Sequence, residues 1–454
     1  MSPEEVKGKR VTIIGAARSG LAAARLLSRT GATVFLTDRG ELSDEAKQNL
    51  HEAGVAFEEG GHTDRALEAD FFVISPGVPS SNELVQQALH AGLAVYSEIE
   101  AASWFCRAPV VAITGSNGKT TTTSLAGYIF TRAGRNTSVA GNIGFPFSDF
   151  ALERVPEDVV VLEVSSFQLD HIAAFRPRVS VLLNITPDHL DRYDNDFGKY
   201  ARSKFRILEN QKDDDVLVYN HDDVLVREYV ERITGQRKLW ALGFSREQFL
   251  SQGAFVRDGA IVLRLAGNEE MLMAPEELAL RGEHNLYNSM AAALAAKAMG
   301  VGSNVIREGL ATFAGVPHRL EFVRELDGVK YVNDSKATNV DAVRYALGSF
   351  EEPIVLIAGG KDKGNDYTPL KPLVERKIRA IVAIGESAEK VVRELGPCTP
   401  QSVRADSMEA AVRKSKDLAH VGDVVLLSPA CASFDMFKNY EDRGDTFKRI
   451  VLGL

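Results

Sequence analysis

A glycine-rich segment at residues 114–123, TGSNGKTTTT, carries the residue types that bind nucleotide phosphates. It follows an apolar run at 110–113 and leads into a helical pattern over 121–132. Glycines let backbone N–H groups face phosphate oxygens, Lys119 can reach the outer phosphates, and Thr120 can bind Mg²⁺. The two glycines enclose two residues rather than four, which is a shorter variant of the common phosphate loop. The order of strand, loop, lysine, threonine and helix favours phosphate binding over a simple glycine turn before a threonine-rich helix. The predicted loop residues are Gly115, Ser116, Asn117, Gly118, Lys119, Thr120 and Thr121.

Two further polar side chains follow apolar runs that we expect to be neighbouring strands. Glu163 ends the run at 159–163, and His189 comes shortly after the run at 179–184. Ligands usually bind at the carboxyl edge of open α/β sheets, and a carboxylate with an imidazole suits Mg²⁺ or Mn²⁺. A lone glutamate at a strand end is more often a cap, and a lone histidine a satisfied polar group. Their joint position beside a phosphate loop favours a metal site.

Lys204 lies in a segment, YARSKFRIL at 200–208, whose apolar residues recur with an amphipathic helical spacing. Such a helix presents its charged side chains to water. The spacing by itself therefore predicts a solvated lysine without a chemical role.

The elements that must position these side chains alternate along the chain between apolar runs and helical patterns. The first hundred residues contain runs at 11–15, 33–38 and 70–77, a second block opens at residue 109, and a third at residue 331. Strands that alternate with helices imply parallel sheets with right-handed crossovers. The sequence thus predicts an α/β fold of three domains. These are a Rossmann-like N-terminal domain (1–97), a central P-loop ATPase-like parallel-sheet domain (98–315) and a C-terminal Rossmann-like domain (316–454).

Length and composition agree with this organisation. The chain has 454 residues, more than one hydrophobic core usually serves, with 45% hydrophobic and 25% charged residues. No apolar stretch reaches the roughly 20 residues of a membrane helix, and the first residues lack the features of a signal peptide. We therefore expect a soluble, cytoplasmic protein. Cys106, Cys398 and Cys431 have no metal-ligand spacing and are predicted to be free thiols.

The net charge of −9 argues against nucleic-acid binding. Any anionic substrate must therefore meet a local cluster of basic side chains. One enzyme class to weigh is the nicotinamide-dependent oxidoreductases, because GAARSG at 15–20 follows a strand and Asp38 follows the next strand. Ala17 replaces the glycine at which the backbone must approach a pyrophosphate, which weakens that interpretation.

Several longer segments resemble the muramyl-peptide ligases of peptidoglycan synthesis, and the resemblance covers essentially the whole chain. They are the phosphate loop, AGNIG at 140–144, EVSSFQLD at 163–170, NITPDHLDRY at 184–193, GEHNLYN at 282–288, VPHRLE at 316–321, NDSKATN at 333–339 and SPACASFDMFKNYEDRG at 428–444. The last two, with SSFQLD, are similar to the members that add D-glutamate. The motif of the members that add a diamino acid is absent.

The resemblance implies an ATP-dependent amide ligase. ATP would phosphorylate the terminal carboxylate of UDP-N-acetylmuramoyl-L-alanine, and the amine of D-glutamate would attack the acyl-phosphate to give a tetrahedral intermediate. ADP and phosphate would be released. Positive charges around the transferred phosphoryl group would supply most of the catalysis. The implied cofactors are ATP and two Mg²⁺ ions, with Mn²⁺ as an alternative, and the implied assembly is a monomer without a membrane span.

Site residues are also carried over from the resemblance. Lys119, His189 and Lys204 would be catalytic, and Lys204 would work as a carbamate, an anionic oxygen donor for a metal. The metal ligands would be Thr120, Glu163, His189 and the Lys204 carbamate. Besides the loop, the ATP site would contain Asn285, Asn288, Arg319 and Asp334. The UDP-substrate site would contain Ser19, Asp38, Arg39, Ser75, Gly77, Asn142, Ser165 and His189. The D-glutamate site would contain Lys336, Thr338, Lys363, Ser433 and Tyr440, the last at a position often occupied by phenylalanine.

The same resemblance identifies the residues that would form the basic cluster expected to meet an anionic substrate. Arg39, Lys119, Arg319, Lys336 and Lys363 come from all three predicted domains, so closing the domains would assemble it.

Two other functions share part of this pattern. A folate polyglutamate ligase would use ATP in the same way but would need a pteridine pocket in place of the first domain. A nucleotide-gated binding protein without turnover would not need Lys119, Glu163, His189 and Lys204 together.

Overall fold

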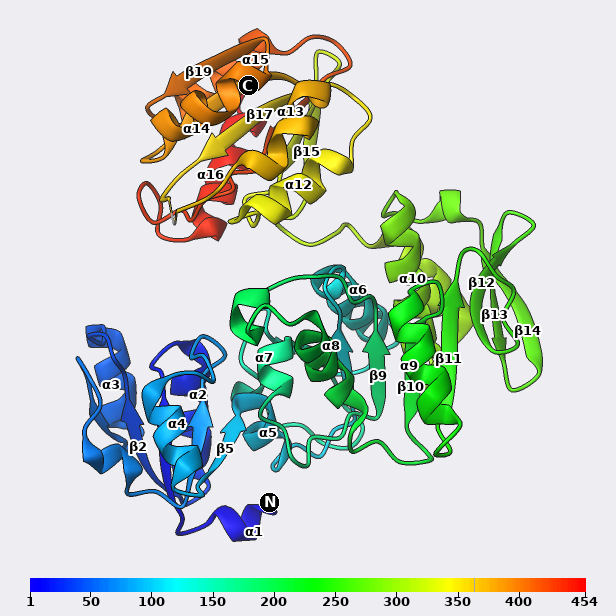
Figure 1. The fold of residues 1–454 in the computed structure, drawn as a ribbon. Coiled ribbons are helices and arrows are strands. Elements are labelled where there is room, and N and C mark those ends of the chain that lie inside the picture. The colour runs from blue at the N-terminus through cyan, green and yellow to red at the C-terminus, as the bar shows by residue number, and fades with distance from the viewer. Residues whose placement is uncertain (363) are drawn as a thin grey trace. The chain divides into compact units, whose positions relative to one another are not determined.

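A computed structural model of the chain describes residues 1–362 and 364–454. Lys363, predicted to bind D-glutamate, lies outside the described residues. The chain divides into two compact units, Met1–Ala314 and Gly315–Leu454. The first unit contains two sheets and the second contains one (Figure 1).

The N-terminal sheet is parallel and five-stranded, with the order β3-β2-β1-β4-β5. Successive residues of β1 face opposite sides of the sheet. Ile13 packs with α2 and α3, whereas Ile14 packs with α4, so helices cover both faces. The strands are β1 (Arg10–Ile14), β2 (Thr33–Thr37), β3 (Ala56–Glu58), β4 (Phe71–Ile74) and β5 (Ala94–Ser97). The helices are α1 (Pro3–Val6), α2 (Arg18–Arg29), α3 (Asp44–Glu52), η1 (Asp64–Leu67), α4 (Glu83–His90) and α5 (Glu98–Ser103).

The central sheet has nine strands in the order β14-β13-β12-β11-β10-β9-β6-β8-β7. Strands β6 to β12 run parallel, and β13 and β14 extend the edge as antiparallel strands. The strands are β6 (Val110–Thr114), β7 (Thr137–Gly141), β8 (Val159–Glu163), β9 (Val179–Leu182), β10 (Val216–Asn220), β11 (Trp240–Ser245), β12 (Gly253–Arg257), β13 (Ala260–Leu265) and β14 (Asn268–Met273). The helices are α6 (Lys119–Arg132), η2 (Phe147–Asp149), α7 (Ser166–Leu169), η3 (Leu190–Tyr193), α8 (Phe197–Phe205), η4 (Arg206–Leu208), α9 (Val224–Thr234), η5 (Pro275–Glu277), α10 (Glu283–Ala298) and α11 (Ser303–Thr312).

The order of the central strands determines where the site forms. Strand β6 lies between β8 and β9, and all three run parallel, so their carboxyl ends meet at one edge. Ile113 pairs with Glu163, and Thr114 pairs with Leu182. Glu163 is the last residue of β8, and the segments after β6 and β9 carry the phosphate loop and His189, as the sequence predicted from the carboxyl-edge rule.

The second unit is a six-stranded sheet with the order β15-β16-β20-β17-β18-β19, parallel except for the edge strand β15. One buried cluster contains residues of α12 to α14, and another contains residues of α15 and α16, so helices again cover both faces. The strands are β15 (Glu321–Leu326), β16 (Val329–Asn333), β17 (Ile354–Gly359), β18 (Ile378–Ile384), β19 (Gln401–Ala405) and β20 (Val424–Leu427). The helices are α12 (Val340–Gly348), η6 (Thr368–Leu370), α13 (Lys371–Lys377), α14 (Ala388–Leu395), η7 (Gly396–Cys398), α15 (Met408–Leu418) and α16 (Tyr440–Leu452).

The predicted α/β fold with three mainly parallel sheets is confirmed. The domain boundaries after residues 97 and 315 stay predictions. The alanine-rich stretch at 291–298 lies in the later part of α10, which begins at Glu283. The three cysteines are free thiols, as predicted. Among the described residues, no helix has the length and apolar character needed to cross a membrane.

Candidate active site

The phosphate loop connects β6 to α6 and is held in a close-packed conformation. Gly118 is the N-cap of α6 with a φ of 82°, a left-handed conformation that favours glycine. A Cβ atom at this position would lie 2.3 Å from Oδ1 of Asn288. The first turn of α6 therefore packs directly against α10, and its N–H groups and helix dipole favour an anion.

Hydrogen bonds also connect the phosphate loop to the segment that follows β9. Asn117 N donates to Oδ1 of Asn184 at 2.8 Å, and the Asn184 amide donates back to Asn117 O at 3.1 Å. The Ser116 hydroxyl donates to Thr186 O at 2.8 Å and lies 2.9 Å from the Tyr200 hydroxyl. These contacts hold the loop in its conformation.

The Lys119 ammonium folds back over the loop. Its Nζ donates to the carbonyl oxygens of Gly115 at 2.8 Å and Ser116 at 2.9 Å. The charge is therefore held at the loop itself, where a bound phosphate would be placed.

Glu163 and Thr120 meet at the edge of the sheet. The Thr120 hydroxyl donates to Oε2 of Glu163 at 2.7 Å, and the Asn142 amide donates to Oε1 at 2.7 Å. Glu163 is only 2% exposed. Close packing supports this arrangement, because a Cβ on Gly141 would lie 2.3 Å from Glu163 O. A hydroxyl and a carboxylate oxygen fit Mg²⁺, which usually takes few protein ligands and shares the phosphates of the substrate.

Lys204 is buried, and the prediction of a solvated lysine from helical spacing was wrong. Lys204 is 1% exposed, and its Nζ donates to Gly115 O at 2.8 Å, the same oxygen that accepts from Lys119. Burial lowers the pKa of the Lys204 ammonium well below its usual range, and the charge of Lys119 acts in the same direction. The spacing failed because Lys204 lies on the buried face of α8 with Tyr200 and Ala201, whereas Lys199 and Arg202 of the same helix are exposed.

His189 occupies a strained turn between β9 and η3. Its φ is 50°, which is left-handed and unusual for a non-glycine residue. The ring lies 5.1 Å from that of Phe167, and Nε2 lies 3.6 Å from Oδ2 of Asp188. Within the described residues, no three His, Cys, Asp or Glu side chains form a preformed metal cluster. The metal roles carried over to His189, Glu163, Thr120 and Lys204 stay predictions.

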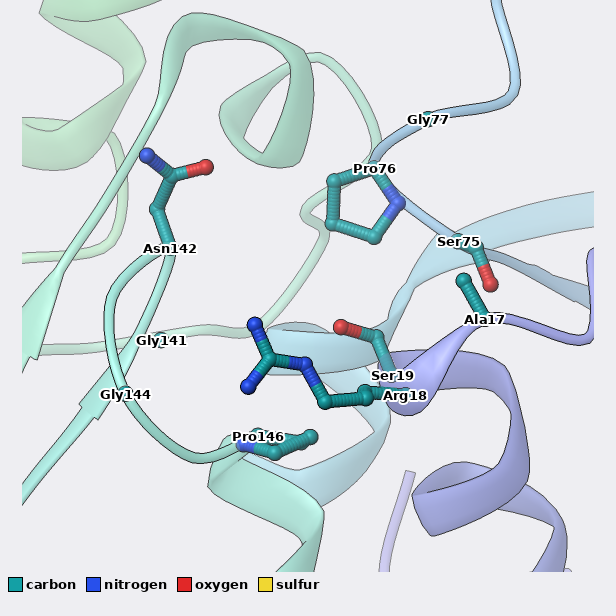
Figure 2. A pocket seen from close by; sticks show the side chains of 10 residues that line it. All are labelled: Ala17, Arg18, Ser19, Ser75, Pro76, Gly77, Gly141, Asn142, Gly144 and Pro146. Carbon is teal, nitrogen blue, oxygen red and sulfur yellow. The ribbon is translucent and has the colours of Figure 1, made fainter. Parts of the chain in front are cut away.

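A pocket of about 200 Å³ lies where the carboxyl ends of β1, β4 and β7 approach one another (Figure 2). It brings together four of the residues predicted for the UDP-substrate: Ser19, Ser75, Gly77 and Asn142. The other lining residues are Ala17, Arg18, Pro76, Gly141, Gly144 and Pro146. A Cβ on Gly20 would lie 1.8 Å from Gly15 O, so the helix start is pressed against the strand end.

Arg18 is the cationic residue that the sequence interpretation missed. Figure 2 shows its guanidinium extending from the start of α2 toward the segment of Gly141 and Gly144. The residue lies inside GAARSG, whose glycine spacing is similar to a dinucleotide-binding fingerprint. The basic side chain within that segment was the signal that could have identified it.

Other residues predicted for the UDP-substrate do not line this pocket. The Asp38 carboxylate accepts from Ala16 N at 2.5 Å and Gly40 N at 2.7 Å, which holds the ends of two loops together. Arg39 is exposed. Ser165 caps α7 and forms a capping box with Gln168. Their roles in binding stay predictions.

Two residues predicted for ATP lie near the start of α10. The Asn288 amide donates to Oδ1 of Asn285 at 3.2 Å, and Thr122 of α6 donates to Oδ1 of Asn288. Asn288 is 5% exposed and packs on the phosphate loop, whereas Asn285 lies further toward the surface. The position of Asn288 is consistent with a structural support for the loop.

In the second unit, Asp334 follows β16 and is 4% exposed. Burial raises the pKa of its carboxyl to about 7, although the Ser428 hydroxyl, which donates at 2.7 Å, and the charge of Arg319 oppose that shift. The side chain thus combines a buried carboxyl with a neighbouring cation.

The four described residues predicted for D-glutamate also lie in this unit. Nζ of Lys336 lies 5.8 Å from the ring centroid of Tyr440, and Ser433 is buried. Arg443, which the sequence analysis missed, is 1% exposed and supports this region. It donates to the carbonyl oxygens of Ser335 and Cys431. Burial lowers its pKa to about 10. A buried arginine inside a helical pattern gives no local sequence signal.

Comparison with known proteins identifies the class to which this fold and site belong. Residues 10–84 match the MurD N-terminal domain, 113–296 match the Mur ligase middle domain, and 318–431 match the Mur ligase glutamate ligase domain. The chain belongs to the Mur ligase family.

Individual relatives narrow the comparison. The chain is 61% identical to the UDP-N-acetylmuramoylalanine--D-glutamate ligase of Salinibacter ruber, over 99% of both chains. It is 48% identical to the enzyme of the same name from Chloroherpeton thalassium, over the whole of both chains. Among solved structures, the UDP-N-acetylmuramate-alanine ligase of Thermotoga maritima has a TM-score of 0.59 at 17% identity, with 98% of this chain and 99% of that chain covered. That likeness concerns the fold.

Arg18 should contribute to anion binding in the pocket. We expect Arg18→Ala to weaken the binding of UDP about tenfold, because a hydrogen bond to a charged group is among the stronger ones. Isothermal titration calorimetry measures the change in Kd. Arg29→Ala, at the other end of the same helix and exposed, is the matched control. Equal Kd values for the two variants would contradict the role of Arg18.

Lys119 should stabilise charge on the transferred phosphoryl group rather than only hold ATP. We expect Lys119→Ala to lower turnover by roughly 10²-fold or more, as when another key electrostatic group is removed. Phosphate release at saturating ATP measures it, with Lys119→Arg as the charge-retaining comparison. Near-normal turnover with only a raised requirement for ATP would show that the lysine merely binds the nucleotide.

Proposed function

We propose that this chain joins D-glutamate to UDP-N-acetylmuramoyl-L-alanine, with ATP converted to ADP and phosphate. The observation that carries the proposal is the 61% identity over 99% of the chain to a ligase of that name. The phosphate loop, Glu163 and the pocket at Arg18 lie in the same unit, which supports the proposal because they would bind phosphate, a metal and an anionic substrate.

The reaction has two steps. A carboxylate oxygen of the alanyl group attacks the γ-phosphorus of ATP, the bond to the β-γ bridging oxygen breaks, and ADP leaves. The amine of D-glutamate then attacks the acyl carbon, the tetrahedral intermediate loses inorganic phosphate, and the nitrogen gives up a proton. Both steps develop negative charge on phosphoryl and carbonyl oxygens. Preorganised cations and N–H groups therefore provide the main acceleration.

The phosphate loop would hold ATP through its N–H groups and the start of α6. Lys119, held by the carbonyls of Gly115 and Ser116, would turn toward the β- and γ-phosphates. The short contacts of Ser116 and Asn117 to the β9 loop mean that little reorganisation is needed when ATP binds. Preorganisation of this kind is what makes electrostatic stabilisation effective.

Glu163 and Thr120 would hold Mg²⁺, with His189 and a carbamylated Lys204 as further ligands. Bound there, Mg²⁺ would neutralise phosphate charge and polarise the transferred group. Asn142 donates to Glu163 and also lines the pocket, so it would orient the carboxylate next to the substrate.

The pocket at Arg18 would bind the anionic part of the UDP-substrate. Ser19 and the N–H groups at the start of α2 offer donors, and Arg18 offers the positive charge that the overall charge of −9 does not supply. In the second unit, Lys336, Thr338, Lys363, Ser433 and Tyr440 would bind D-glutamate. Asp334 and Arg319 would contact the nucleotide.

Lys204 would act as its carbamate. Carbamate formation requires a neutral amine and carbon dioxide. Burial of the side chain and the nearby Lys119 ammonium are the surroundings that favour the neutral form. A carbamate would also remove the repulsion of two ammonium groups that share one carbonyl oxygen.

Substrate choice tests the function directly. We expect phosphate release to require both UDP-N-acetylmuramoyl-L-alanine and D-glutamate, because both steps must proceed before the products leave. A coupled assay of phosphate release with D-glutamate, L-glutamate and a diamino acid measures the preference. Equal turnover with L-glutamate or the diamino acid would contradict the proposed function.

The carbamate has its own test. Lys204→Ala should be nearly inactive yet folded, and a short-chain carboxylic acid should restore some turnover by supplying the missing oxygens. Phosphate release with added acetate or ethylamine measures this, and circular dichroism checks the fold. Rescue by the amine and not by the acid would mean that Lys204 acts as a cation.

A further inference from the structure

Arg192 is a side chain without a role in the scheme above, and it makes contacts on two sides. It lies in η3, three residues after His189. Its guanidinium donates to Pro76 O at 3.3 Å and to Gly77 O at 3.1 Å. The guanidinium carbon also lies 4.3 Å from the ring centroid of Phe167.

On one side, the Arg192 guanidinium contacts the wall of the pocket. Pro76 and Gly77 line it and follow β4 of the N-terminal sheet, whereas Arg192 follows β9 of the central sheet. A single side chain therefore connects the carboxyl edges of two sheets. A movement of the wall on ligand binding would change the positions of the two carbonyl oxygens that Arg192 contacts.

On the other side, Arg192 contacts the turn that carries His189. Arg192 N donates to His189 O at 3.0 Å, and the Phe167 ring beneath the guanidinium lies against the ring of His189. The left-handed backbone of His189 costs free energy, so neighbouring contacts must hold it in place. Arg192 and Phe167 provide such contacts.

The far end of the turn is fixed independently. The Tyr193 hydroxyl donates to Oδ2 of Asp170 at 2.8 Å, and its ring stacks with Phe167 at 6.1 Å. Tyr193 is buried and also contacts the ring of Tyr200, whose hydroxyl reaches Ser116 of the phosphate loop. Because this end is anchored in the core, displacement of Arg192 would act mainly on His189.

The chemistry of these contacts suits arginine. A planar guanidinium can donate to two neighbouring carbonyls while its face rests on an aromatic ring. An ammonium would keep part of the hydrogen bonding without the planar stack, and an apolar side chain of similar length would keep neither.

We propose that Arg192 is a positioning residue that couples the binding of a ligand in the pocket at Ser75, Pro76 and Gly77 to the placement of His189. This deepens the proposed function and rests on it for the role of His189. A bound ligand orders the pocket wall and so fixes the carbonyl oxygens of Pro76 and Gly77, which accept hydrogen bonds from Arg192. Arg192 in turn holds the turn that carries His189. The coupling is reciprocal, so loss of Arg192 weakens ligand binding as well as turnover.

Steady-state kinetics of Arg192→Met and Arg192→Lys test the coupling. We expect Arg192→Met to lower kcat about tenfold and to raise the KM for the UDP-substrate several-fold, with the KM for ATP unchanged. Arg192→Lys should recover part of both effects. Arg202→Met is the matched control, because Arg202 lies nearby in α8 and reaches Asp196 only at 3.9 Å. Unchanged kinetics in Arg192→Met, or a lower thermal midpoint with all KM values unchanged, would overturn the proposal.

Hydrogen exchange with UDP as the probe tests the coupling without turnover. In the unmodified protein, UDP should slow exchange at 75–78 and also at 187–193. In Arg192→Met, UDP at saturating concentration should slow it only at 75–78. Slowed exchange at both segments in the variant, or at the first alone in the unmodified protein, would refute the coupling. If both segments respond as expected but D-glutamate supports no phosphate release, the proposed function fails and the coupling stands.

Discussion

The buried carboxylate of Glu163 is the constraint around which the central site is organised. At 2% exposure it must be hydrogen-bonded, because an unpaired buried carboxylate is costly. Thr120 from the start of α6 and Asn142 from the segment after β7 satisfy one oxygen each. One side chain thus determines the relative positions of a helix start and two strand ends, and it leaves donor atoms suited to a hard cation beside the phosphate loop.

Two cationic side chains at the candidate site of this unit, Lys119 and Arg192, donate to backbone carbonyl oxygens. Lys119 donates to the carbonyls of Gly115 and Ser116 in the loop that carries it. Arg192 donates to the carbonyls of Pro76 and Gly77. Cations placed in this way keep their charge available to an anionic ligand. They supply locally what a chain of net charge −9 cannot supply as a whole.

The two candidate ligand-binding regions of the first unit are the phosphate loop with Glu163 and the pocket at Arg18. They are connected by shared side chains. Asn142 lines the pocket and also donates to Glu163. In addition, the rings of Phe167, Tyr193 and Tyr200 pack in series between the Arg192 guanidinium and the Ser116 hydroxyl. Packed aromatic rings resist independent movement because interiors are dense. The arrangement suits a reaction in which a nucleotide and a second anionic substrate must be placed together before chemistry begins.

The sequence by itself determined the alternation of strands and helices, the phosphate loop and the identity of the family, because these depend on local periodicity and on short ordered motifs. It also located Glu163 at a strand end, where parallel topology brings ligands together. Only the tertiary structure decided the environment of each side chain. Helical spacing predicted a solvated Lys204, whereas packing of α8 against the loop buries it. Arg192 and Arg443 were missed for the same reason. An arginine's role depends on which distant carbonyl, ring or pocket its long side chain reaches, and sequence spacing does not record those distances.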